Sequence, residues 1–205
     1  MQYFDTLPKM ILTNDNGVST IMTNLMARVS IVPEILKNPM VYYKYDIQEG
    51  DTPEMIAHKY YNDSYRYWIV LFANKILDPQ WDWPLSSLQF NEYVNDKYGN
   101  NLNDLHHYEK VITKTTRGTD DDQTVTEKFV ISIEEYVSLL YSHPFGIDVA
   151  RTFSLPIGFV DITIQPTAVT NYDYELDLNE SKRSINILNS KYVDQLEMQF
   201  QDLMS

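Results

Sequence analysis

Histidines are the side chains of this chain best suited to acid–base catalysis or metal binding, and there are four of them, His58, His106, His107 and His143. A nucleophilic enzyme needs a serine or cysteine activated by a histidine that a carboxylate orients. The sequence has no Gly-x-Ser-x-Gly turn, no His-Glu-x-x-His pattern, no phosphate-binding glycine loop and no dinucleotide fingerprint. We therefore expect no catalytic residues and no enzymatic activity.

Two short runs resemble metal ligands, the pair His106 and His107 and the acidic run 120–122. Adjacent side chains of a strand point to opposite faces, so the two histidines are not expected to share an ion. The acidic run lacks the Asp-x-Asp-x-Asp-Gly spacing of a calcium loop, which favours a solvated turn. Cysteine is absent, so thiolate sites and disulfides are excluded. We expect neither metal nor cofactor.

The charge of the chain restricts its partners. The formal net charge is -13 and 29 residues are acidic, which argues against nucleic acid as a ligand and against docking on an anionic membrane. A glycosidase needs two carboxylates at a fixed separation, and no pattern in the sequence marks such a pair. The first residues lack the basic and apolar segments of a secretory signal, and the apolar run 68–73 is too short to span a bilayer.

Aromatic residues are abundant, with 16 Tyr, 8 Phe and 3 Trp. Tyrosine and tryptophan offer a large rigid surface with a polar group, which suits both a core and a subunit interface. The sequence leaves both roles open. The aromatic residues singled out for core or interface are Tyr61, Tyr67, Trp68, Trp81 and Trp83.

We predict an α+β protein with three regions: an N-terminal arm (1–41), a compact module (42–90) and a β-hairpin-rich region that ends in an amphipathic helix (91–205). In the arm, a helix is predicted with Ser19 or Thr20 as its cap. Its apolar positions are Ile21, Leu25, Met26 and Val29.

The middle region begins with alternating residues, 41–48, that indicate a half-buried strand. Gly50 permits a turn, and Thr52 followed by Pro53 is a typical helix start. A second helix is predicted after Asp63 or Ser64, with an apolar face made by Trp68, Leu71 and Phe72. Asn74 is expected to end it.

The order strand, turn, helix, helix resembles a LysM module, a small βααβ domain known for binding peptidoglycan. The resemblance implies a glycan groove between the turn and the segment after the second helix. The residues expected at this groove, either as a relic or as an interface, are Gly50, Asp51, Thr52, Pro53 and Asn74.

The last region is predicted to contain a helix ending at Gly99 and a long β-hairpin, 106–117 with 123–133, whose tip is acidic. Residues 133–141 indicate a short helix or strand, and 153–166 a strand. Alternation over 172–178 predicts a strand whose hairpin partner holds Ile185 and Ile187. A terminal helix capped by Ser190 is expected to pack on its own sheet or on another subunit. Its seam is Val193, Leu196, Phe200 and Leu203.

Several segments together resemble the base plate wedge proteins of contractile-tailed bacteriophages. They are EGDTPEMIA (49–57), the pairs Tyr60-Tyr61 and Tyr67-Trp68, Asn74, the pair Asp78-Pro79, DWP (82–84), YDYELDLNESKR (172–183) and the final apolar helix.

This resemblance implies a structural subunit that links neighbouring wedges around the tail hub, located in the virion and assembled in the bacterial cytoplasm. Its expected partners are the wedge-ring protein, the sheath-initiating subunit, the central hub and spike complex and neighbouring copies of the wedge. Six copies per base plate would follow from a six-fold ring. The alternatives are a LysM-type peptidoglycan-binding protein and a cell-wall hydrolase with a LysM targeting module.

Overall fold

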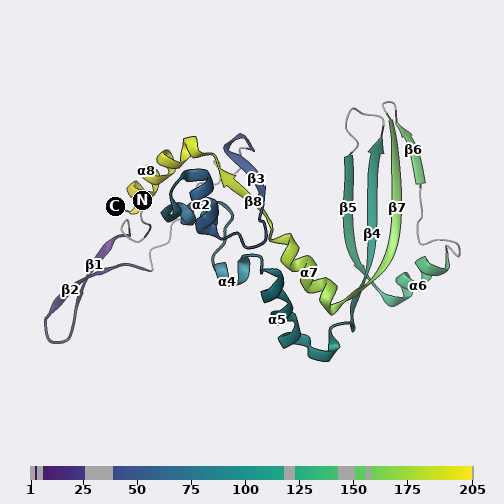
Figure 1. The fold of residues 1–205 in the computed structure, drawn as a ribbon, viewed down its shortest axis with the longest axis horizontal. Coiled ribbons are helices and arrows are strands. Elements are labelled where there is room, and N and C mark those ends of the chain that lie inside the picture. Colours follow the sequence, from purple (N-terminus) through teal and green to yellow (C-terminus); the bar gives the residue numbers. More distant parts are fainter. Residues whose placement is uncertain are drawn as a thin grey trace. The chain divides into compact units, whose positions relative to one another are not determined.

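The computed structural model describes residues 3, 7–25, 39–117, 123–142, 151–155 and 158–204. The chain divides into two compact units, the first made of Met1–Phe90 with Asn179–Ser205 and the second of Asn91–Leu178. Helices and strands occur in both units (Figure 1), in agreement with a mixed α and β protein. The first unit takes residues from all three regions proposed from the sequence, and the boundaries of those regions stay predictions.

The first unit begins with a two-stranded antiparallel ribbon, β1 (Lys9–Thr13) with β2 (Ser19–Thr23). The helix predicted from Ser19 onward is therefore wrong as far as Thr23, and its positions Met26 and Val29 lie outside the described residues. The physical reason is the turn, where Gly17 has a φ of 77° and the Asn14 side-chain oxygen accepts the N–H groups of Asn16 and Val18. Such a turn selects a hairpin over a helix.

The predicted strand near residue 42 is confirmed as β3 (Tyr42–Asp46), after a short 3-10 turn, η2 (Pro39–Val41). β3 pairs antiparallel with β8 (Ser184–Leu188), with Tyr45 opposite Ile185. Ile185 and Ile187 do lie in a strand, but their predicted hairpin partner at 172–178 is wrong. The strand that pairs with β3, namely β8, therefore comes from a much later part of the chain than β3 and the two helices that follow it.

The two predicted helices of the middle region are present as α2 (Pro53–Tyr61) and α3 (Tyr67–Ala73), joined by η3 (Ser64–Arg66). The Thr52 hydroxyl accepts the N–H of Met55, and the Asp63 carboxylate caps η3. Asn74 ends α3, as predicted. The buried face of α3 is wider than predicted, because Ile69 and Val70 are fully buried in addition to Trp68.

The core of the first unit lies between α2, α3, the β3–β8 pair and the terminal helix α8 (Val193–Met204). Asn189 caps the turn η5 (Ser190–Tyr192) that leads into α8, in place of the predicted cap Ser190. Val193, Leu196 and Phe200 are buried in this core, whereas Leu203 is 61% exposed. The first three predicted seam positions therefore pack on their own unit, and Leu203 does not.

Two further helices follow α3, namely α4 (Pro79–Asp82) and α5 (Ser87–Tyr98). The predicted helix end at Gly99 is confirmed, since this glycine has a φ of 54° and opens the turn η4 (Gly99–Asn101). A left-handed residue of this kind commonly ends a helix.

The second unit is built on a four-stranded antiparallel sheet with the strand order β5-β4-β7-β6 (Figure 1). Its strands are β4 (Leu105–Arg117), β5 (Gln123–Ile131), β6 (Arg151–Leu155) and β7 (Gly158–Thr170). The predicted hairpin is confirmed as β4–β5, and its acidic tip, 118–122, lies outside the described residues. Residues 133–141 form a helix, α6 (Ile133–Tyr141), whose Tyr136 stacks on Tyr108 of the sheet.

The strand predicted over 172–178 is wrong, because these residues lie in the helix α7 (Asn171–Ser181). The start of α7 is a reciprocal cap. The Thr170 hydroxyl donates to the Asp173 carboxylate at 2.7 Å and accepts the Asp173 N–H at 3.2 Å. A Thr-x-x-Asp pattern is a helix-start signal, and it outweighs the alternation of apolar residues that follows.

The two adjacent histidines are closer than strand geometry predicts. A bulge shifts the register of β4 between Leu105 and His107, and it brings the two Nδ1 atoms of His106 and His107 to 2.7 Å. His106 stacks on Tyr174 of α7, and His107 Nε2 lies 2.9 Å from Glu109. The expectation that their side chains point apart is therefore wrong. In the described part of the chain no group of three or more His, Cys, Asp or Glu is arranged to hold a metal ion.

A buried carboxylate joins α7 to α5 within the second unit. Lys97 Nζ and the Tyr98 hydroxyl both donate to Glu175 Oε1, at 2.6 and 2.8 Å. Burial raises the pKa of Glu175, but the hydrogen bonds from Lys97 and Tyr98 outweigh burial, and the pKa is lowered. The hydrogen bond to Glu175 in turn raises the pKa of Lys97.

We predict that this contact makes the second unit sensitive to acid. A lowered folded-state pKa contributes stability that is complete above the unfolded value, about 4.3, and is lost as the pH falls through the folded value. Glu175→Gln should therefore flatten the loss of stability below about pH 4.5. Hydrogen exchange of β4 and β7 amides as a function of pH measures this. Glu92→Gln, an exposed α5 position, is the control, and an equal acid response in Glu175→Gln and wild type would contradict the prediction.

Candidate functional site: a cleft beside the Gly50 turn

A cleft of about 540 Å³ opens in the first unit beside the turn that precedes α2. Its walls come from three segments of the chain, namely the β3–α2 turn, the stretch from α4 to the start of α5, and the residue that follows α7 and precedes β8. The lining residues are Ile47, Gln48, Glu49, Gly50, Asp51, Thr52, Pro53, Pro79, Gln80, Trp83, Pro84, Leu85, Ser86, Gln89 and Arg183.

The first wall is a turn held by its own aspartate. Gly50 takes a φ of 83°, which a residue with a side chain adopts only with strain. The Asp51 carboxylate accepts the Gln48 N–H at 2.9 Å and the Tyr45 hydroxyl at 2.6 Å. The hydrogen bond to Asp51 and partial burial raise the pKa of Tyr45 to about 12. The turn is thus fixed before α2 begins at Pro53.

The second wall is tied to the first through tryptophan. Trp83 Nε1 donates to the backbone oxygen of Asp51 at 3.0 Å, and its ring packs against the core. The neighbouring Trp81 differs, because its side chain is 64% exposed. The backbone oxygen of Trp81 accepts from Lys182 Nζ at 2.6 Å.

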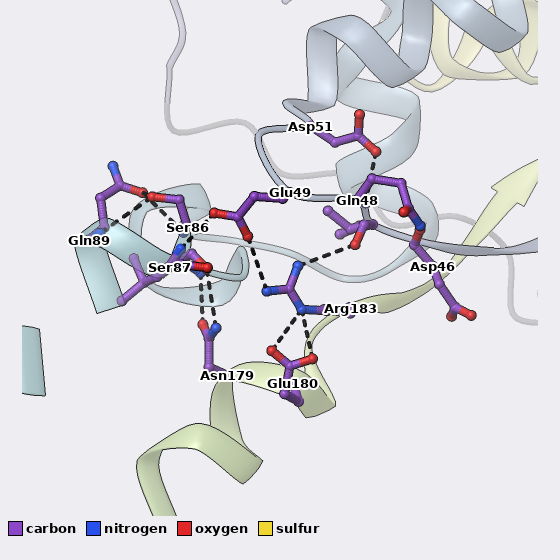
Figure 2. Close-up of polar contacts among 12 residues, drawn as sticks. Asp46, Gln48, Glu49, Asp51, Ser86, Ser87, Gln89, Asn179, Glu180 and Arg183 are labelled. Carbon is purple, nitrogen blue, oxygen red and sulfur yellow. Dashed lines mark hydrogen bonds and ion pairs between the residues drawn. The ribbon is translucent and has the colours of Figure 1, made fainter. Parts of the chain in front are cut away.

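Arg183 forms the third wall and contacts the first, and Glu49 of the first wall in turn contacts the second (Figure 2). Arg183 Nε bonds both carboxylate oxygens of Glu180 at 2.8 Å, and its Nη1 bonds the Ile47 backbone oxygen at 3.3 Å. Its Nη2 lies 3.6 Å from Glu49 Oε2. Glu49 Oε1 accepts the N–H of Ser87 at 2.7 Å, in the first turn of α5. Arg183 therefore bridges segments 136 residues apart in the chain.

A buried amide reinforces the same arrangement. Asn179, at the end of α7, exchanges two hydrogen bonds with the backbone of Leu85, at 2.7 and 3.2 Å (Figure 2). Asn179 is 5% exposed, so both polar ends of its side chain need partners, and Leu85 supplies them.

The structure brings together four of the five residues predicted for the groove, because Gly50, Asp51, Thr52 and Pro53 all line the cleft. Asn74 does not line it. Its side chain donates to the backbone oxygens of Val70 and Asn186, at 2.8 and 2.9 Å, and accepts the Asn186 N–H at 2.7 Å. Asn74 thus fastens α3 to β8.

The singled-out aromatic residues fall into three groups. Tyr61 and Trp68 are buried in the core, Tyr67 and Trp83 are partly buried against it, and Trp81 is largely exposed. Sequence reasoning missed Glu49 and Arg183 as lining residues of the cleft, and Asn179 as the residue that holds the backbone of Leu85. The one local sign of the arginine's role is the i, i+3 spacing of Glu180 and Arg183, which also contact each other.

The polar groups of the cleft already bond to one another. Arg183 faces Glu180 and Glu49, Asp51 accepts from Tyr45 and Gln48, and the indole N–H of Trp83 is used. These contacts join three chain segments, which is what a structural junction requires. Among the described residues, no helix is long and apolar enough to cross a membrane.

Comparison with protein families gives a match over the first part of the chain. A family model described as base plate wedge protein 53 matches residues 2–115, more than half of the 205-residue chain. The matched part includes β3, α2, α3 and two walls of the cleft, whereas Arg183 lies beyond it. No curated protein matches the chain.

Proposed function

The chain belongs to the base plate wedge protein 53 family, and from this membership we propose that it joins neighbouring wedges of a phage tail base plate around the central hub. Membership by itself makes the chain a structural component of the base plate, located in the virion tail and in contact with other base plate components. The finer role as a clamp between wedges is the proposal.

The observation that carries the proposal is that each unit exposes an apolar surface of its own. The first unit exposes the paired ribbon side chains Ile11 and Ile21, and the second exposes Val125 and Phe129, which lie on the same face of β5. Contiguous apolar surfaces on a protein of this kind mark interaction sites. A subunit that links two neighbours needs at least two such surfaces, and this chain has one on each unit.

The partners follow from the position of such a clamp. We propose the wedge-ring protein, the sheath-initiating subunit, the hub and spike complex and the neighbouring wedge copies as contacts. One copy per wedge in a six-fold ring would make six copies, joined by heterologous contacts that close a ring. Assembly would take place in the cytoplasm of the bacterial host.

Glycan binding by a LysM-like module is the second candidate, because Gly50, Asp51, Thr52 and Pro53 do line a cleft. Against it, the Arg183, Glu49 and Asp51 side chains are bonded within the protein and offer a sugar few unused groups. Saturable binding to peptidoglycan that Asp51→Ala abolishes would favour this candidate. We propose that the cleft instead stabilises the unit that carries the contacts.

The test of the proposed function is a phage from which the gene is deleted. We expect complete wedges to accumulate without joining into base plates, since the contacts between them are missing. Sedimentation and mass spectrometry of the particles measure this, and a wild-type copy supplied in trans is the control. Complete base plates that form without the chain would refute the clamp.

A further inference from the structure

The ribbon made by β1 and β2 is exposed along its whole length. Every residue from 9 to 23 is exposed to solvent, including apolar side chains on both strands. A two-stranded hairpin is at best marginally stable in water without a surface to pack on. The ribbon therefore needs a covering surface that the described residues of this chain do not provide.

Each face of the ribbon carries an exposed pair of apolar side chains, one from each strand. Side chains alternate between faces along a strand, and residues paired across the strands share a face. Met10 lies opposite Met22, and Ile11 lies opposite Ile21, on the other face. Ile11 and Ile21 are 70% and 69% exposed, and Met10 and Met22 are 43% and 50% exposed. A partner that covers one face only would leave the other apolar pair in water.

The tip of the ribbon is polar and exposed to solvent. The Asn14 side chain accepts two backbone N–H groups of the turn, and Asp15 and Asn16 are exposed. A ribbon that enters a lipid bilayer tip first would bury a carboxylate and two amides, which is costly. The polar tip thus favours a protein groove from which the tip emerges.

The ribbon is also neutral in a strongly acidic chain. Lys9 and Asp15 are the ionisable side chains of residues 9–23, so their charges cancel, whereas the whole chain carries -13. Two copies of the chain repel each other at long range. A neutral apolar ribbon is suited to neutral apolar walls, with an acidic group beside Lys9 at the base.

We propose that residues 9–23 insert between two apolar walls of another base plate subunit, with Met10 and Met22 against one wall and Ile11 and Ile21 against the other. The polar tip at Asp15 then lies in solvent beyond the walls. This inference rests on the proposed function, because that function supplies the class of partner. It adds the element that binds, the chemistry of the groove and the requirement for two walls.

The test uses two double variants, Ile11→Ser with Ile21→Ser and Met10→Ser with Met22→Ser, supplied in trans to the deletion phage. Each removes the apolar pair of one face, and Asp15→Asn at the tip is the matched control. We expect each double variant to enter purified tails at least about ten-fold less than wild type, and Asp15→Asn to enter equally. Because all five side chains are exposed, the thermal unfolding of the purified variants should match that of wild type.

A photo-reactive amino acid at position 11 or 22 gives the second readout. We expect both positions to crosslink to another base plate polypeptide in assembled tails. Normal entry of either double variant would overturn the two-walled groove. Crosslinks between two copies of this chain, or binding of the free protein to phosphatidylglycerol vesicles, would also overturn it. Absence of the wild-type chain from tails would refute the proposed function itself. If the wild-type chain is present and all variants enter tails equally, only the proposal that the ribbon inserts into a groove is refuted.

Discussion

Replacement of Trp68 by alanine is expected to lower the free energy of unfolding of the first unit by about 3–5 kcal/mol. Trp68 is 3% exposed, and its ring lies 4.9 Å from that of Phe200 and 6.0 Å from that of Phe72. Its removal leaves a cavity where α3 meets α8, in the centre of the core. Because the indole N–H of Trp68 has no hydrogen-bond partner among the described residues, Trp68→Phe should cost less.

Trp81→Ala is the matched control, since the same side chain is 64% exposed there. Its effect should stay within about 0.5 kcal/mol, as for most surface substitutions. Urea unfolding followed by tryptophan fluorescence measures both variants, because all three tryptophans of the chain lie in the first unit. Equal destabilisation by Trp68→Ala and Trp81→Ala would contradict the assignment of the core.

Arg183→Ala is expected to destabilise the first unit by about 2–3 kcal/mol, the scale of hydrogen bonds to charged groups. The guanidinium is held by Glu180, by Glu49 and by the Ile47 backbone oxygen, with its side chain 22% exposed. Its loss disconnects the segment before β8 from the turn before α2. Arg183→Lys should recover little, because an ammonium cannot reproduce the planar fork.

The cleft should loosen in the same variant. Trp83, whose indole N–H bonds Asp51 across the cleft, is the local reporter. We expect faster exchange of this indole proton in Arg183→Ala, observed by NMR, with Lys191→Ala, an exposed position of the same unit, as the control. Unchanged exchange in Arg183→Ala would show that the arginine does not hold the walls together.

The parts of the fold that local chemistry determines could be predicted. Thr52 and Pro53 start α2, Gly99 follows the end of α5, and the β4–β5 hairpin has long β-branched strands. These signals act over a few residues and need no distant partner. The same holds for the missed turn at Gly17, which lies just before Ser19, the predicted start of a helix.

The predictions are wrong where tertiary contacts or a helix cap determine the structure of a segment. Residues 172–178 alternate like a strand, yet the Thr170 and Asp173 cap starts a helix that Glu175 fastens through Lys97. The pairing of β3 with β8 joins residues far apart in sequence, and no local pattern encodes it. The Arg183 bridge is of the same kind. Four cleft residues could be predicted because they are consecutive in one local turn. The third wall, Arg183, could not be predicted because it is distant from that turn in sequence.

The position of this chain in the assembled tail decides whether it clamps neighbouring wedges together. Electron cryo-microscopy of purified tails, at a resolution that traces side chains, tests this most directly. We predict one copy per wedge, in contact with subunits of two adjacent wedges, with the β1–β2 ribbon enclosed on both faces. Copies that contact a single wedge only, or tails that lack the chain, would contradict the proposal that it clamps the wedges together.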